Sequence, residues 1–159
     1  GKGYALKFGI EKIQELYPNA TGIVTADGDG QHSIPDIISL VEKLQQVSSD
    51  TLLLGVRSFK KDQTPKKSYF GNRLTSLFYY LASGIKLEDT QTGLRGFKQE
   101  RFNALKQISG NRFEYEMNVL LQAGILGLTI ETIPIKTIYE NNNEQSHFRA
   151  VQDLSLIHI

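Results

Sequence analysis

The sequence has no cysteine, almost no net charge and no long uninterrupted apolar run. The lack of cysteine excludes disulfide bonds, thiolate metal sites and cysteine nucleophiles, and it fits a reducing compartment. The longest apolar stretch, residues 119–130, is broken by Gln122 and carries two glycines, so it falls short of the roughly 18 to 20 residues of a membrane-spanning helix. Because 18 Lys and Arg balance 17 Asp and Glu, no global field attracts nucleic acid, which we do not expect as a partner.

The apolar periodicity indicates an α/β fold in a single domain. Helical spacing predicts helices over residues 4–16, 33–44, 68–83, 99–107 and 114–122, and β-rich runs predict strands over residues 21–26, 51–57, 94–97 and 129–135. Strands separated by helices favour a sandwich around a largely parallel sheet, in which Pro134 marks an edge strand. Residues 58–67 are polar and predict a mobile loop.

Two helices carry more specific signals. Ser33 is a suitable cap for the second helix, with Pro35 and Asp36 in the first turn. Its expected buried face consists of Ile37, Leu40, Val41 and Leu44. The helix over residues 68–83 is amphipathic, with a broad apolar face made of Phe70, Leu74, Leu77, Phe78, Leu81 and, just beyond it, Ile85.

The strongest chemical signal is the acidic motif of residues 27–32, Asp-Gly-Asp-Gly-Gln-His, which follows a predicted strand. Asp27 and Asp29 project to the same side of an extended backbone and can share one hard divalent cation, while the glycines leave room for a phosphate. In open α/β sheets, ligands collect beyond the carboxyl ends of the strands, which favours a site over a solvated turn.

Two other readings of this motif can be tested against the sequence. An EF-hand loop starting at Asp27 requires Gly and Glu where His32 and Ile38 stand, so that reading fails. A phosphatase in which Asp27 is the nucleophile also begins with Asp-x-Asp after a strand, but it needs a later acidic pair that the sequence lacks. It remains the alternative enzyme, and a non-catalytic nucleotide-sugar or glycan-binding domain is the alternative of another class.

Five segments in order resemble the family 2 glycosyltransferases, especially the branch of dolichyl-phosphate mannose synthases and polyprenyl-phosphate glycosyltransferases. These segments are residues 1–6, 26–32 with Pro35, 55–57, 89–97 and 146–149, so the resemblance covers residues 1–153. It implies a GT-A fold, a Rossmann-like three-layer sandwich with a mostly parallel mixed sheet. It also implies an inverting transfer of a sugar from a UDP- or GDP-sugar to a polyprenyl-phosphate or glycan acceptor.

The same resemblance assigns roles to residues. Asp27, Asp29 and Gln31 are expected to hold Mg²⁺ or Mn²⁺ against the donor diphosphate, as hard oxygen ligands suit those ions. The substrate-binding residues are expected to be Lys2, Arg57, Arg95, His147 and Arg149. Arg57 has the guanidinium fork that phosphate oxygens favour, although a strand-end arginine is more often a surface charge.

Asp89 and Glu116 are the catalytic candidates. Asp89 resembles the acidic residue that faces the acceptor, but it could equally cap its own turn through Thr92 or a backbone amide. With a phosphate acceptor no base is needed, so its role would be electrostatic. Glu114 and Glu116 open a predicted helix, where the helix dipole favours acidic side chains, and capping is a sufficient explanation for Glu114.

The remaining expectations concern the ends of the chain and its surface. By resemblance, residues 1–153 form a partial catalytic domain that lacks the strands holding the base and ribose of the donor, so we expect weak metal binding and no turnover from this piece alone. Residues 154–159 match the read-through of a sequencing adaptor and are expected to be non-native. The basic residues Lys60, Lys61, Lys66, Lys67 and Arg73 suit an anionic lipid surface or a lipid phosphate, and we expect a cytoplasmic location at the inner face of a membrane.

Overall fold

The computed structural model describes residues 1–57 and 66–136. It contains helices α1 (Lys2–Leu16), α2 (Ile34–Gln46), α3 (Lys66–Ser83), α4 (Phe102–Gln107) and α5 (Glu114–Gln122), the short 3₁₀ helix η1 (Gln99–Arg101), and strands β1 (Gly22–Thr25), β2 (Thr51–Arg57), β3 (Arg95–Lys98) and β4 (Thr129–Ile135). The predictions for Lys60, Lys61, His147, Arg149 and residues 154–159 lie outside the described residues.

Most of the predicted elements are present. Ser33 caps α2 as expected, because its Oγ accepts a hydrogen bond of 3.3 Å from the Asp36 amide. Leu40 and Leu44 form the buried face of that helix, but the expectation for Val41 is wrong, since it is exposed. The predicted loop of residues 58–67 is wrong at its end, where Lys66 and Lys67 already belong to α3. No helix within the described ranges is long and apolar enough to cross a membrane.

The four strands form a mixed sheet in the order β1-β3-β2-β4. Strands β1, β2 and β4 run in one direction and β3 lies antiparallel between β1 and β2, so the sheet is mixed and mostly parallel in strand direction, as expected, although only the β2–β4 pair is hydrogen-bonded in parallel. Strand β3 is reversed because the segment that precedes it is bound by Arg57 at the end of β2. It therefore begins where β1 and β2 end, and it runs in the opposite direction to them. Pro134 lies in the edge strand β4, as predicted.

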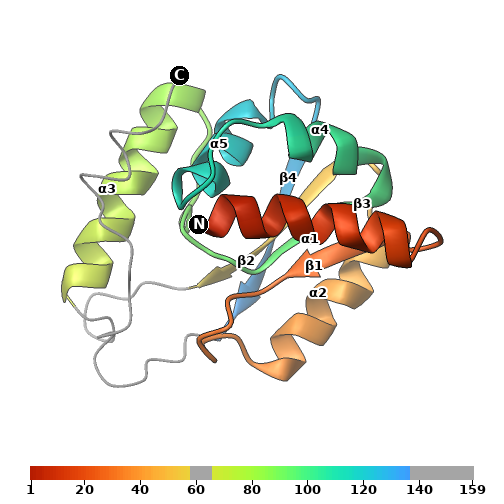
Figure 1. The fold of residues 1–159 in the computed structure, drawn as a ribbon. Helices are drawn as coiled ribbons and strands as arrows, with labels where there is room; N and C mark the ends of the chain where they lie inside the picture. Colours follow the sequence, from red (N-terminus) through yellow and green to blue (C-terminus); the bar gives the residue numbers. More distant parts are fainter. Residues whose placement is uncertain (58–65, 137–159) are drawn as a thin grey trace.

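Helices cover both faces of this sheet (Figure 1). Leu52 and Leu54 face the layer formed by α1, α4 and α5, where the larger apolar cluster lies. Leu53, which points to the opposite face, packs with Leu40 and Leu44 of α2. The three layers therefore follow from the alternation of side chains along the buried strand β2.

Helix α3 lies at one side of these layers (Figure 1) and packs with an unexpected face. It buries Asn72, Thr75 and Tyr79, which recur at helical spacing, whereas most of its large apolar side chains are exposed. The predicted amphipathic pattern is present, but its apolar stripe points away from the core.

Gly3 allows α1 to approach α5. A Cβ atom at this position would lie 2.6 Å from the Tyr115 Cβ and 2.9 Å from the Gly110 carbonyl oxygen. We expect Gly3→Ala to lower the free energy of unfolding by about 1–3 kcal/mol, because the helix must shift to relieve the overlap. The matched control is Gly9→Ala in the same helix, where nothing lies within 4 Å and helix propensity should raise stability by up to about 1 kcal/mol. Denaturant unfolding followed by circular dichroism measures both, and equal stability of the two variants would contradict the contact.

Candidate active site

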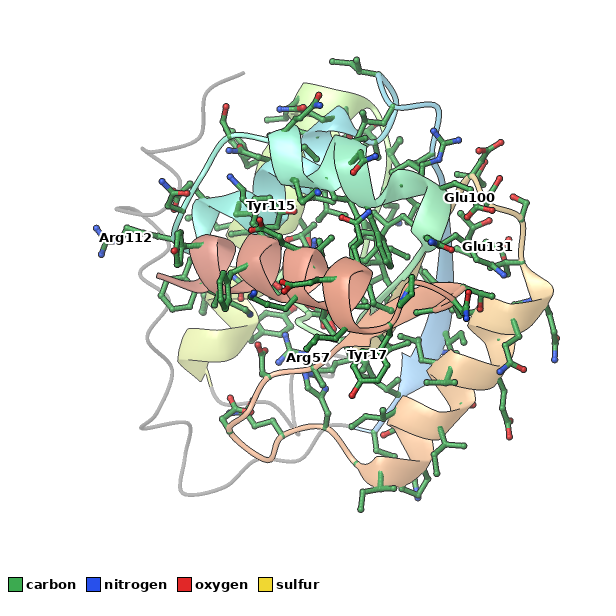
Figure 2. The ribbon with its side chains drawn as sticks, turned by 45° about the vertical axis from the view of Figure 1, so that its right-hand side comes forward. Tyr17, Arg57, Glu100, Arg112, Tyr115 and Glu131 are labelled. Carbon is green, nitrogen blue, oxygen red and sulfur yellow. The ribbon has the colours of Figure 1, made fainter. Side chains whose placement is uncertain are left out.

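The candidate site lies at the edge of the sheet where β1 and β2 end and β3 begins. Thr25 is the last residue of β1 and pairs with Arg95, the first residue of β3. Arg57 ends β2 at the same edge. Figure 2 shows Arg57 at one end of the sheet and Glu100 and Glu131 at the other. The residues following β1 and preceding β3 therefore meet, as ligand-binding residues do in open α/β sheets.

Lys2 connects three elements at this edge. Its Nζ lies 2.6 Å from Asp27 Oδ1 and 2.7 Å from Glu116 Oε2. Glu116 is in the first turn of α5, and the start of α1 is tied to the residues before α5 by a 3.0 Å hydrogen bond from the Gly3 amide to the Arg112 carbonyl. All three charged side chains are at least two-thirds buried. One ammonium group thus bridges two carboxylates that come from distant parts of the sequence.

Asp27 is enclosed on its other side by His32 and Gly93. The Nε2 atom of His32 lies 3.7 Å from Asp27 Oδ2, a separation longer than a hydrogen bond. A Cβ atom at position 93 would overlap the Asp27 carboxylate, so only glycine lets the carboxylate rest there. Burial alone would raise the pKa of Asp27, but the neighbouring His32 and Lys2 outweigh it and hold the pKa far below the ordinary value. Asp27 is therefore an anion under all mild conditions.

Arg95 is buried and holds the segment of residues 89–94 in place. Its Nε donates to the Thr92 carbonyl at 2.8 Å, its Nη2 to the Thr90 carbonyl at 3.2 Å, and its Nη1 to the Glu116 carbonyl at 2.7 Å. With the side chain 2% exposed, these contacts are those of a positioning residue and not of one that meets a substrate. The substrate-binding role expected for Arg95 has no support in this geometry.

Arg57 and Asp89 form a second ion pair at the same edge. Arg57 Nε lies 2.7 Å from Asp89 Oδ2 and Nη2 lies 3.2 Å from Oδ1, a two-pronged contact in which Asp89 is fully buried. Arg57 is thus no free surface charge. Asp89 also accepts a hydrogen bond from the Gln91 amide at 3.1 Å, so it does cap its own turn through a backbone amide, as the structural alternative predicted.

The predicted metal ligands lie in the loop after β1. Asp29 is exposed, and its Oδ1 accepts a hydrogen bond of 3.1 Å from the Gln31 amide. No group of three or more His, Asp or Glu side chains within the described ranges is close enough to enclose a metal by itself. A set of two carboxylates and one amide still fits Mg²⁺ or Mn²⁺, because Mg²⁺ in phosphate-transfer sites takes one or two carboxylates and completes its shell with substrate phosphates and water. Glu114 accepts hydrogen bonds from the Asn111 and Arg112 amides, so it holds the loop before α5, and these bonds are not the helix cap that was expected of it.

Several buried polar atoms around Asp27 and Asp89 have no hydrogen-bond partner among the described residues. They are His32 Nδ1 and Nε2, Thr90 Oγ1, Gln91 Nε2 and Glu116 Oε1. Buried polar atoms normally find a partner, and exceptions concentrate where a ligand or water completes the network. His32 was quoted in the sequence only as part of the acidic motif. No periodicity or capping signal could reveal that its ring is buried against Asp27.

Comparison with known proteins gives a consistent result. The chain is similar to a curated glycosyltransferase. It is 33% identical over 144 residues to the UDP-N-acetylglucosamine–dolichyl-phosphate N-acetylglucosaminyltransferase of Methanococcus voltae, an alignment that covers 87% of this chain and 56% of that protein. It is 34% identical over 146 residues to an uncharacterized protein of Methanocaldococcus jannaschii, covering 87% of this chain and 58% of that protein. The chain thus spans a little over half the length of these relatives, and no family model matches it.

The Lys2 bridge can be tested by its effect on stability. Lys2→Met leaves Asp27 and Glu116 as two partly buried carboxylates without their cation, so the free energy of unfolding should fall by about 1–3 kcal/mol. Lys12→Met is the matched control, since Lys12 pairs with Glu15 on an exposed face and its loss should cost no more than about 0.5 kcal/mol. Adding Glu116→Gln to Lys2→Met should restore part of the loss in denaturant unfolding. A double variant less stable than Lys2→Met would contradict the bridge.

Tyr115, beside the site, should make stability fall at alkaline pH. Burial raises its pKa to about 12, with a smaller opposing effect of the Arg95 charge, and its hydroxyl donates to the Leu105 carbonyl at 2.9 Å. The unfolded chain loses this proton near the ordinary value of 10.0 while the folded chain keeps it, so the contribution is complete below pH 10 and is lost as the pH rises towards 12. Unfolding of Tyr115→Phe should show a shallower decline over that range. Parallel curves for the two proteins would exclude this explanation.

Proposed function

We propose that this chain is part of the catalytic domain of a glycosyltransferase that moves a sugar from a nucleotide sugar to a polyprenyl-phosphate acceptor. The supporting observation is that Lys2, Asp27, Glu116 and the Arg57–Asp89 pair converge at one edge of the sheet in a chain 33% identical to a dolichyl-phosphate N-acetylglucosaminyltransferase. That relative uses UDP-N-acetylglucosamine by its name, which makes this the first donor to test.

The metal ligands in this proposal are Asp27, Asp29 and Gln31. Bound there, Mg²⁺ or Mn²⁺ would offset the negative charge of the donor diphosphate as it departs. Lys2 contributes by holding Asp27 ionised and in place, since its ammonium lies 2.6 Å from one carboxylate oxygen. Gly93 contributes by leaving room for the Asp27 carboxylate, and Arg95 contributes by holding the neighbouring Thr92 carbonyl in place.

Arg57 is the proposed phosphate-binding residue, and Asp89 is its positioning partner. Asp89 is buried and accepts hydrogen bonds from Nε and Nη2 of the guanidinium, so it fixes the orientation of the Arg57 side chain and reduces its conformational freedom. The Asp89 carboxylate is buried and already bound to Arg57, so its oxygens are engaged and not free to take a proton from an acceptor. This fits an acceptor that is itself a phosphate anion and has no proton to lose.

The proposed reaction is a single displacement with inversion. A phosphate oxygen of the acceptor attacks the anomeric carbon and forms the new C–O bond. The bond from that carbon to the donor diphosphate breaks on the opposite face, and its electron pair leaves with the nucleoside diphosphate. The GT-A arrangement of the whole domain, and a cytoplasmic site at the inner membrane face, are parts of the same proposal.

The decisive experiment measures transfer of labelled N-acetylglucosamine from its UDP donor to a polyprenyl phosphate by the protein encoded by the reading frame that contains this chain. Asp27→Ala combined with Asp29→Ala should lower the rate at least about a hundredfold, and chelation of divalent ions should do the same. Ile34→Ala, an exposed change on α2, serves as the control that leaves the rate unchanged. For residues 1–159 alone we expect weak metal binding and no turnover.

Three results would exclude the proposal. Full transfer activity after both aspartates are replaced would mean that they hold no metal. Release of inorganic phosphate from a model phosphoester, lost on Asp27→Asn, would instead support the aspartyl phosphatase. Binding of the nucleotide sugar with no metal dependence and no turnover by the encoded protein would point to a non-catalytic binding domain.

A further inference from the structure

The Lys2 ammonium group lies at a position that its own helix does not favour. Lys2 is the first residue of α1, and the first turn of that helix contains no acidic residue. The positive end of the helix dipole disfavours a cation there. The carboxylates of Asp27 and Glu116, 2.6 and 2.7 Å from Nζ, compensate for this cost. The candidate site, and not the stability of α1, therefore explains why a lysine lies here.

Lys2 directly contacts a carboxylate that is also a proposed metal ligand. The side chains of Lys2 and Asp27 are only 23% and 30% exposed, so solvent screens the charges around them in part. Carboxylate oxygens bind Mg²⁺ directly, at about 2.1 Å. Because Nζ is already 2.6 Å from Asp27 Oδ1, a divalent ion on Asp27 and the ammonium group would repel each other at short range. The two cations therefore compete for one carboxylate.

Glu116 offers a second position for the Lys2 ammonium group. Its Oε2 lies 2.7 Å from Nζ, whereas its Oε1 is buried and has no hydrogen-bond partner among the described residues. Arg95 Nε lies 3.7 Å from Oε1 but donates its hydrogen to the Thr92 carbonyl. Oε1 can therefore accept the N–H group that Asp27 would release. A lysine has three donors on a flexible stem, so this shift requires no movement of α1.

We propose that Lys2 is an exchangeable counter-ion of the metal site. Its ammonium group is paired with Asp27 while no divalent ion is bound, and it moves fully onto Glu116 when Mg²⁺ or Mn²⁺ binds Asp27. Lys2 thereby keeps the site ordered and lowers its affinity for metal, and Glu116 is a positioning residue that acts through Lys2. This inference rests on the metal site of the proposed function. It gives Lys2 and Glu116 roles other than the substrate-binding and catalytic ones expected from the sequence.

The test is a titration with Mn²⁺, without donor or acceptor, of the protein encoded by the reading frame that contains this chain. The electron paramagnetic resonance signal of free Mn²⁺ measures binding. Lys2→Met should bind Mn²⁺ at least about tenfold more tightly than the wild type, because the competing cation is gone. The matched control is Lys7→Met, which removes the same charge from the same helix, where Nζ lies over the Tyr115 ring. It should change the affinity less than about twofold.

Two further measurements test the exchange itself. Saturating Mn²⁺ should recover about half or more of the stability that Lys2→Met loses in denaturant unfolding, because the ion takes the place of the ammonium group. Glu116→Gln should weaken Mn²⁺ binding at least about threefold when Lys2 is present, since the ammonium group is then confined to Asp27. Combined with Lys2→Met, the same substitution should have a smaller effect.

The possible failures of this inference and of the proposed function are distinguishable. Unchanged Mn²⁺ affinity in Lys2→Met, an equal gain in Lys7→Met, or a stability loss that Mn²⁺ does not reduce would overturn the exchange but leave the proposed function in place. Equal effects of Glu116→Gln with and without Lys2 would overturn the role of Glu116. Mn²⁺ binding that survives Asp27→Ala combined with Asp29→Ala would overturn the metal site, and both proposals with it.

Discussion

The candidate site depends on one cation placed between two carboxylates. Lys2 belongs to the first turn of α1, Asp27 follows β1 and Glu116 opens α5, so a single ammonium group joins three elements that the chain visits at widely separated points. Without it, two carboxylates would face each other in a partly buried space, where their repulsion is poorly screened. The close approach of α1 to α5, which only glycine at position 3 permits, is the packing condition for this bridge.

The segment of residues 89–94 converts that local charge arrangement into a larger site. It begins with Asp89 bound to Arg57 at the end of β2, and it ends with Gly93 against the Asp27 carboxylate. The buried Arg95 side chain donates hydrogen bonds to a carbonyl group of this segment and to the backbone carbonyl of Glu116. The Arg57–Asp89 pair and the Lys2–Asp27 pair therefore both contact the segment of residues 89–94. That arrangement explains why β3 must enter the sheet between β1 and β2 and run against them.

The same geometry separates residues that could meet a ligand from residues that support them. Arg95 and Asp89 are buried and bonded to the protein itself, whereas Asp29 is open to solvent and Arg57 is partly so. Both groups appear together in the sequence motifs, because a motif records which residues are needed and not how each is used. Helix α3 presents a similar distinction. Its periodicity predicts an apolar face, but the opposite, polar face is the one that forms hydrogen bonds with the rest of the protein, so the apolar face points outward.

The sequence by itself determined the positions of most helices and strands, the cap at Ser33, and the presence of acidic residues beyond a strand, because these follow from periodicity and local hydrogen bonding. Only the tertiary structure decided the antiparallel direction of β3, the pairing of Lys2 with Asp27 and Glu116, the burial of His32 and the outward turn of α3. Each of these depends on contacts between residues far apart in the chain. Such contacts are selected by packing and charge in three dimensions, and they leave no spacing in the sequence by which they could be predicted.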